Sequence, residues 1–147
     1  AKGKEIGLSC FEGGADIIFA AGGATGDGAY EAAAETGNFA IGVDSNQDYI
    51  QPGTMITSMM KGVDKSVYRV IEQSIAADGA VFSSIDSYGL AENFVGATWI
   101  VDETNLFSET GPADLTSQIP GLLEEVRKVR EQIISGEIVV TDVTAGG

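Results

Sequence analysis

The sequence predicts an α/β fold with a mainly parallel central sheet and helices on both faces. Short apolar runs without polar alternation stand at residues 17–19 and 39–43, as expected for strands buried on both faces of a parallel sheet. Helix-forming residues lie between them at 29–35, and Gly37 follows as a C-cap, which completes a β-α-β unit. The length suits one domain, so residues 1–147 are expected to form a single α/β unit.

The remaining elements follow from apolar spacing and turn residues. Residues 1–13 predict a helix with Ile6, Cys10 and Phe11 on its apolar face. Residues 115–134 predict the clearest helix, because six apolar residues recur there at helical spacing. Further predictions are strands at 55–60, 80–85, 94–101 and 137–140, a helix at 63–77 and a polar loop at 102–112.

Charge and composition exclude several classes of function. The chain carries 22 acidic and 8 basic residues, and this net charge of −14 argues against nucleic acid or an anionic membrane as a partner. No histidine is present, which excludes a histidine-based triad or metal site. The single cysteine, Cys10, is expected to be a small buried hydrophobic residue rather than a nucleophile. No signal peptide or membrane-spanning run is visible, and no metal or cofactor is expected.

The candidate site lies where predicted parallel strands end, at the edge where open α/β sheets bind ligands. The glycine loop with Gly22 and Gly23 fits neither the dinucleotide fingerprint nor the P-loop, so it is either a structural turn or a backbone cradle for a ligand oxygen. Asp44 could accept hydrogen bonds from a vicinal diol or act as a turn residue. Lys61 would point toward the same crevice or be a surface lysine at a helix start.

Several motifs follow one another along the chain in a recognisable order. They are Ala1-Lys2-Gly3-Lys4-Glu5, Gly14-Ala15-Asp16-Ile17-Ile18-Phe19, Ala21-Gly22-Gly23-x-x-Gly26, Ala40-Ile41-Gly42-Val43-Asp44-Ser45-x-Gln47, Thr57-Ser58-Met59-x-Lys61-x-Val63-Asp64 and Ile133-Ile134-x-Gly136-Glu137-Ile138-Val139-Val140. In this order they closely resemble the basic membrane protein family of ABC-transporter substrate-binding lipoproteins, the purine-nucleoside receptors. The resemblance spans nearly the whole chain.

The resemblance implies a fold and a function. Family members fold as two α/β lobes around a cleft, and this chain corresponds to the second lobe alone of a type I periplasmic-binding-protein fold. The implied function is binding rather than catalysis: capture of a purine nucleoside or similar small ligand outside the cytoplasmic membrane for an ABC permease, by a full-length protein that is lipid-anchored. The implied roles are backbone contacts from Gly22 and Gly23, ribose binding by Asp44 and a polar contact at the hinge from Lys61.

The sequence departs from the family pattern at residues 84–93, where a glycine-rich strand turn is usual, and this leaves the ligand open. The alternative function is a small nucleotide- or flavin-using α/β enzyme built on the same sheet edge. Helices 63–77 and 115–134 would normally pack on the missing first lobe. Their apolar stripes would then lack cover, so the chain is expected to form a homo-oligomer.

Overall fold

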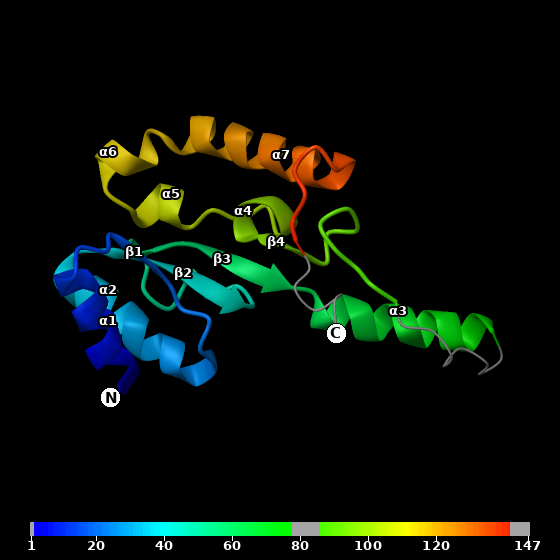
Figure 1. Cartoon of the computed structure of the whole chain (residues 1–147), viewed down its shortest axis with the longest axis horizontal. Helices are drawn as coiled ribbons and strands as arrows, with labels where there is room; N and C mark the ends of the chain where they lie inside the picture. The colour runs from blue at the N-terminus through cyan, green and yellow to red at the C-terminus, as the bar shows by residue number, and fades with distance from the viewer. Residues whose placement is uncertain (1, 78–85, 142–147) are drawn as a thin grey trace.

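The computed structural model describes residues 2–77 and 86–141, and its elements form a central sheet with helices on both faces (Figure 1). Within these residues the sheet holds four strands in the order β1-β2-β3-β4. The first three are parallel, and β4 runs antiparallel to β3. The prediction of an α/β fold with a mainly parallel sheet is confirmed. The strands are β1 Ile17–Phe19, β2 Phe39–Asp44, β3 Met55–Lys61 and β4 Val95–Ala97.

Helices α1 (Lys2–Glu12) and α2 (Gly26–Thr36) lie together on one face of the sheet (Figure 1). Helix α2 completes the predicted β-α-β unit, and Gly37 ends it with a left-handed φ of 71°. The two helices approach closely because α1 presents glycine to α2. A Cβ atom on Gly7 would stand 2.9 Å from the Cβ of Ala32, which leaves no room for a side chain.

The buried face of α1 matches the apolar face predicted from the sequence only at Phe11. Gly3, Gly7 and Phe11 are buried, whereas Ile6 is 52% exposed and Cys10 is exposed as well. The prediction that Cys10 is a buried hydrophobic residue is therefore wrong. The physical reason is the close contact with α2, which places Gly3 and Gly7 against that helix and leaves Ile6 and Cys10 outside the contact.

Strand β1 forms one edge of the sheet and is covered on one face only. Ile18 packs into the core beneath α1 and α2. Ile17 and Phe19 point to the opposite face and are 48% and 52% exposed. Burial on both faces, predicted from the unbroken apolar run, is wrong for this strand. The helices of the opposite layer pack on residues of β2 and β3 instead.

The second helical layer covers β2 and β3 on the other face (Figure 1). Trp99, Phe107 and Ile119 are its buried hydrophobic residues, and Phe39 and Ile56 pack against them from the sheet. The ring of Phe107 meets that of Phe39 edge-on, with 5.7 Å between the ring centroids. The layer consists of α4 Thr98–Val101, α5 Phe107–Thr110, α6 Ala113–Thr116 and α7 Ile119–Ser135.

Two predictions for this layer are wrong in part. The strand predicted at 94–101 ends after Ala97 and continues as α4, because the Trp99 indole N–H donates to the carbonyl of Ile56 at 2.9 Å and turns the chain over the sheet. The loop predicted at 102–112 contains the helical turn α5, since its apolar residue Phe107 is only 3% exposed and must be packed.

Two further predictions concern the C-terminal part of the chain. The helix predicted at 115–134 is divided into α6 and α7, with Pro120 in the first turn of α7. The strand predicted at 137–140 is absent: Gly136 ends α7 with a φ of 80°, and the residues after it are exposed. The strand predicted at 80–85 lies outside the described residues.

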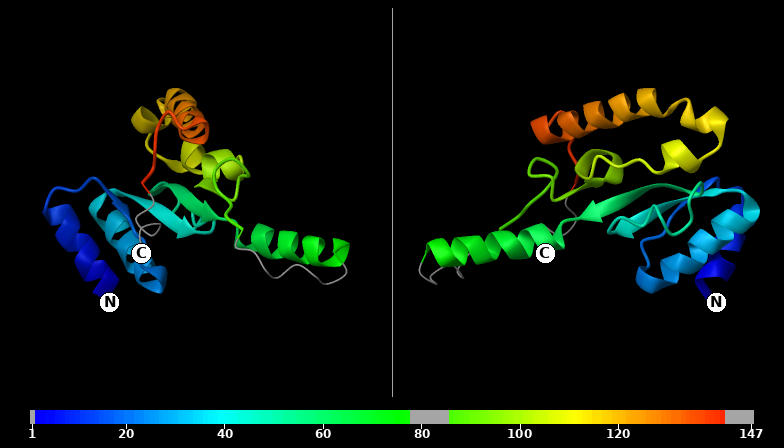
Figure 2. Two further views of the ribbon diagram at one scale, coloured as in Figure 1. Left: turned by 45° about the vertical axis from the view of Figure 1, so that its right-hand side comes forward. Right: turned by 180° about the vertical axis from the view of Figure 1, so that it is seen from behind.

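Helix α3 (Val63–Ala76) matches the helix predicted at 63–77 but projects away from the sheet in every view (Figures 1 and 2). It buries no residue. The exposed large apolar side chains of α3 are Val63, Val67, Tyr68, Ile71 and Ile75.

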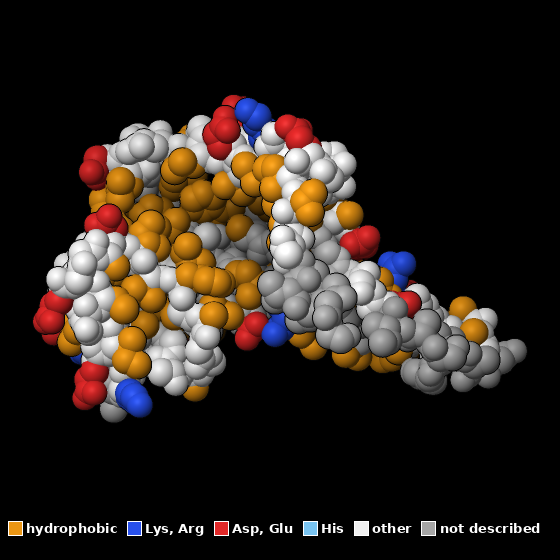
Figure 3. All heavy atoms as spheres, viewed as in Figure 1, with side chains coloured by type: hydrophobic (Ala, Val, Ile, Leu, Met, Phe, Trp, Pro, Cys, Tyr) orange, Lys and Arg blue, Asp and Glu red, His pale blue; other side chains and the backbone are white. Residues whose placement is uncertain are grey.

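Figure 3 shows further hydrophobic side chains gathered in a hollow between the two helical layers. None of the helices in the described ranges is long and apolar enough to cross a membrane.

Candidate functional site

The most prominent polar feature at the sheet edge is an ion pair between two strand ends. Asp44 is the last residue of β2, and Lys61 is the last residue of the neighbouring parallel strand β3. The Lys61 ammonium lies 2.8 Å from one Asp44 carboxylate oxygen, and both side chains are about half exposed. The structure thus brings together two of the residues that the sequence singled out, in a position that a ligand can reach.

The backbone of Asp44 takes a conformation that few residues adopt. Its φ is 71°, in the left-handed region, where aspartate is tolerated better than most other side chains. The amide of Ser45 donates to the carbonyl of Val43 at 2.9 Å, which closes a tight turn directly after the strand. The chain therefore turns sharply at the very residue whose carboxylate stands at the edge.

The glycine loop follows β1 at the same edge of the sheet. Gly22 precedes the short turn η1 (Gly23–Thr25), and Gly23 has a left-handed φ of 55°. Nothing lies within 4 Å of where a Cβ atom of Gly23 would stand, so the backbone there is uncrowded. A loop of this kind can present its peptide groups to a ligand, while glycine supplies the left-handed conformation.

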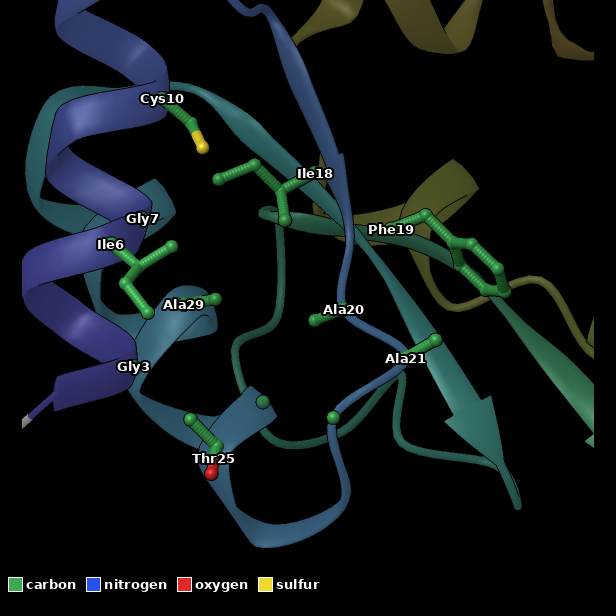
Figure 4. Close-up of a pocket in the computed structure, with 12 residues that line it drawn as sticks. Gly3, Ile6, Gly7, Cys10, Ile18, Phe19, Ala20, Ala21, Thr25 and Ala29 are labelled. Atoms are coloured by element: carbon green, nitrogen blue, oxygen red, sulfur yellow. The ribbon is translucent and has the colours of Figure 1, made fainter.

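The four predicted residues do not line one cavity. Gly22 lines an apolar hollow of about 290 Å³ between α1 and β1 (Figure 4). Lys61 lines a different hollow of about 320 Å³, together with residues of α3 and the segment before β4. Asp44 joins the second region through its ion pair with Lys61. The structure therefore supports Asp44 and Lys61 as one unit and places the glycine loop beside a separate hollow.

An aromatic pair stands on the far side of the hollow that Lys61 lines. Tyr88 and Phe94 both line it, and their rings stack with 4.4 Å between centroids and 22° between planes. The Arg69 guanidinium of α3 lies 5.2 Å from the centre of the Tyr88 ring, a cation–π distance. Tyr88 falls in the stretch at 84–93 where the sequence departs from the family pattern, and Phe94 follows that stretch directly.

The loop that carries these aromatics is held by polar contacts rather than by a core. Arg130 of α7 donates to the carbonyl of Leu90 and to the side chain of Asn93, each at 2.8 Å. The amide of Gly89 donates to a Glu92 carboxylate oxygen at 2.9 Å. This bond, aided by the more distant charge of Arg69, lowers the pKa of Glu92 below its ordinary value.

A polar layer that sequence reasoning missed lies directly under Asp44. The Gln47 side-chain oxygen accepts from the Val43 amide at 2.9 Å and from the Tyr30 hydroxyl at 2.7 Å. Burial, and then the nearby charges of Asp27 and Asp44, raise the pKa of Tyr30, so the phenol stays a donor. Gln47 closes the motif that runs from Ala40 to Gln47, and its position shortly after the strand end is the sequence signal that could have pointed to this role.

The described residues hold no group of three or more cysteine, aspartate or glutamate side chains that could bind a metal. The exposed Cys10 lies in α1, on the hollow that Gly22 lines, and not beside the ion pair. The chemistry that the strand-end unit offers is therefore hydrogen bonding from one acid and one base to a polar ligand.

Comparison with known proteins gives a consistent answer. Residues 1–143 match the family model described as ABC transporter substrate-binding protein PnrA-like, also called Bmp. Basic membrane protein C of Borreliella burgdorferi is 34% identical over 146 residues, which cover 96% of this chain and 37% of that protein. Basic membrane protein D of the same species is 40% identical over 73 residues, or 48% of this chain. The chain thus spans little more than a third of the length of the first of these relatives.

Solved structures show a similar architecture. An ABC transporter solute-binding protein from Aeropyrum pernix K1 superposes with a TM-score of 0.68 at 25% identity, over 96% of this chain and 44% of that one. A protein from Bacillus halodurans, described as a transcriptional activator of the comK gene, gives a TM-score of 0.65 at 20% identity. The second likeness concerns the fold alone.

Proposed function

The chain belongs to the family of PnrA-like ABC-transporter substrate-binding proteins, and we propose that it forms one wall of a cleft that binds a purine nucleoside or a similar small hydroxylated ligand. That family consists of substrate-binding proteins rather than enzymes. In this proposal the full-length protein is lipid-anchored outside the cytoplasmic membrane and delivers the ligand to an ABC permease. The present chain supplies the second of its two lobes.

The single observation that carries the proposal is the half-exposed pair of Asp44 and Lys61 at the carboxyl ends of two parallel strands. A carboxylate has two acceptor oxygens and can hold both hydroxyls of a vicinal diol such as that of ribose. The lysine ammonium can donate to a ligand oxygen or ring nitrogen. An exposed ion pair is worth little by itself, so a ligand that satisfies both groups can replace their mutual contact at small cost.

Three further features support the same ligand class. The uncrowded backbone at Gly23 stands at the end of the adjacent strand β1, ready to contact a ligand with peptide groups. The stacked rings of Tyr88 and Phe94 line the hollow that Lys61 lines, and aromatic faces are suited to a flat base. The acidic surface favours a neutral ligand over a phosphorylated one, because like charges repel.

The experiment is titration calorimetry of the 147-residue chain with adenosine, guanosine and inosine, each paired with its 2′,3′-dideoxy analogue. A single lobe offers half of a cleft, so we expect dissociation constants of about 1 mM, which correspond to about −4 kcal/mol. The dideoxy analogues should bind at least about tenfold more weakly, because they lack the diol that Asp44 would hold. Equal affinity for each nucleoside and its dideoxy partner would contradict the proposed role of the diol.

A further inference from the structure

A buried carboxylate lies beneath the candidate site and is not part of it. Asp48 is 3% exposed, and both of its oxygens are occupied. The Ser58 hydroxyl donates to one oxygen at 2.6 Å, and the Thr98 hydroxyl donates to the other at 2.8 Å. Among the ion pairs of the described residues none includes Asp48. A buried carboxylate is costly unless its hydrogen bonds are complete, so these two donors define its place.

The carboxylate gives every hydrogen bond around it one direction. An ionised carboxylate can only accept hydrogen bonds, so the hydroxyls of Ser58 and Thr98 must both donate to Asp48. The Ser58 oxygen is then free to accept from the Gln47 amide at 3.0 Å. The Thr98 oxygen accepts from the Ser58 amide at 3.3 Å and from the Thr57 hydroxyl at 2.8 Å. No hydroxyl in this set could reverse without leaving one carboxylate oxygen of Asp48 without a donor.

The same network reaches the residue before Asp44. Gln47 is fixed at its amide by Ser58, and its side-chain oxygen accepts from the Val43 amide at 2.9 Å. Gly42 of β2 makes this contact possible, because a Cβ atom there would collide with the Ser58 hydroxyl oxygen. The turn is thereby clamped on both sides of Asp44: through Val43 before it and through Gln47 after it.

We propose that Asp48 is a positioning residue, which clamps the turn at 44–48 onto β3 and so holds the Asp44 carboxylate toward Lys61. The left-handed φ of Asp44, 71°, is a strained conformation that needs such support from its surroundings. The binding consequence of this inference rests on the function proposed above. Its structural part, the clamp itself, stands without any ligand.

The test is Asp48→Asn, which keeps the shape but replaces one acceptor oxygen by an NH₂ donor. That donor forces one hydroxyl to turn its proton away from residue 48, and both remaining bonds lose the negative charge of the carboxylate, so the clamp loosens. In amide hydrogen exchange followed by NMR, the Val43 and Gln47 amides should lose at least about tenfold of their protection. Unchanged protection of both amides would overturn the proposal.

A second ligand-free measurement follows the ion pair directly. In the parent chain, Lys61→Met should move the carboxyl ¹³C resonance of Asp44, because the ammonium stands 2.8 Å away. In the Asp48→Asn background the same change should have little effect, since Asp44 no longer faces Lys61. A full response in that background would contradict the positioning role. If Asp48→Asn does not fold, Thr98→Val tests the clamp instead, because it removes one of the two hydroxyl donors to Asp48. Thr98→Ser keeps that hydroxyl and should retain the protection of the Val43 and Gln47 amides.

The binding arm uses adenosine as the probe. Asp48→Asn should weaken its affinity by about tenfold. The control Phe11→Leu loosens the core under α1, away from the turn, and should lower the melting temperature while leaving adenosine affinity unchanged. Equal weakening by both variants would reduce Asp48 to a general contributor to stability. If the parent chain binds no nucleoside, the proposed function fails, while the exchange and ¹³C measurements still decide the positioning role.

Discussion

Helices α2 and α3 each follow a strand of the parallel part of the sheet, but they differ completely in environment. Helix α2 buries Gly26, Ala29, Tyr30, Ala32 and Ala33 between α1 and the sheet. Helix α3 is longer and has the apolar face expected of a packed helix, yet it buries no residue and stands away from the sheet (Figure 2). An amphipathic pattern thus shows that a face needs cover, but it does not show what covers it.

The difference can be compared with the finding that the chain spans little more than a third of the length of its relative, basic membrane protein C. The first region, from α1 to β3, closes its own core and ends at the Asp44–Lys61 pair. The second region packs on the sheet through a cluster of three buried hydrophobic residues, while α3 and most of α7 keep apolar side chains exposed. We expect these faces to meet the other lobe in the full-length protein, which remains a prediction.

The largest effect should come from placing a charge in α2, and the same kind of change in α3 should have almost none. Ala32→Glu puts a carboxylate at a position with no exposed surface, and it should cost more than about 3 kcal/mol of unfolding free energy. The matched change Ile71→Glu, on the exposed face of α3, should stay within about 0.5 kcal/mol. Urea unfolding of both variants measures the contrast. A comparable loss in Ile71→Glu would show that α3 is covered in solution.

The next effect concerns binding at the edge of the well-packed region. Asp44→Ala removes a carboxylate that would hold ligand hydroxyls, and we expect nucleoside affinity to fall about tenfold or more, since such bonds contribute about 1.5–3 kcal/mol. Stability should fall only modestly: the Asp44 side chain is half exposed, but alanine tolerates the left-handed φ of 71° less well than aspartate. The matched control is Glu35→Gln, whose carboxylate pairs with Lys4 at 2.6 Å on the α1–α2 surface. Parent-like binding by Asp44→Ala would remove Asp44 from the site.

The first region could be predicted well from sequence, and the reason is local. The β-α-β unit has short connections, glycines where the chain turns, and two strands in direct parallel register, Ile17 opposite Phe39. The convergence of Asp44 and Lys61 followed from the rule that parallel strands end at one edge. The clamp at Asp48 could not be found in this way, because Ser58 and Thr98 come from 10 and 50 residues away.

The second region was predicted less well because its structure depends on distant partners. Strand β4 ends earlier than predicted because the indole N–H of Trp99 donates a hydrogen bond to a carbonyl of β3. The polar stretch around Phe107 forms a helical turn because the Phe107 ring packs against Phe39 of the sheet. Residues 137–140 form no strand, since they follow the left-handed Gly136 and stay exposed. Periodicity reports none of these long-range contacts.

A smaller effect is expected in the association of the chain with itself. The exposed faces of α3 and α7 should draw two copies together, more tightly at high salt because screening weakens repulsion between chains of net charge −14. Leu122→Glu on α7, at a half-exposed position, should weaken the dimer by about tenfold. Light scattering at low and high ionic strength measures the mass. A strictly monomeric mass at both would contradict the prediction.

The smallest effect tests how the second region is held where it lacks a core. The Gly89–Glu92 hydrogen bond lowers the pKa of Glu92, so the folded turn favours the ionised carboxylate. A depressed pKa contributes stability that is present above the ordinary glutamate value of about 4.3 and is lost as the pH falls through the lower folded pKa. The turn should therefore loosen on acidification below about pH 4.3. The amide of Gly89, followed by NMR from pH 6 downward, should shift upfield as its acceptor is protonated.

Glu92→Gln is the matched variant for this titration, since it keeps an acceptor oxygen but cannot ionise. It should start with a weaker Gly89 bond and lose the pH dependence of that resonance. The Ser108 amide, which donates to the neutral Asn105 side chain at 3.0 Å in a comparable exposed turn, should not follow the titration in either protein. A Gly89 shift that persists unchanged in Glu92→Gln would assign the titration to another group. The turn would then be held by Arg130 and its two contacts to Leu90 and Asn93, with no contribution from Glu92.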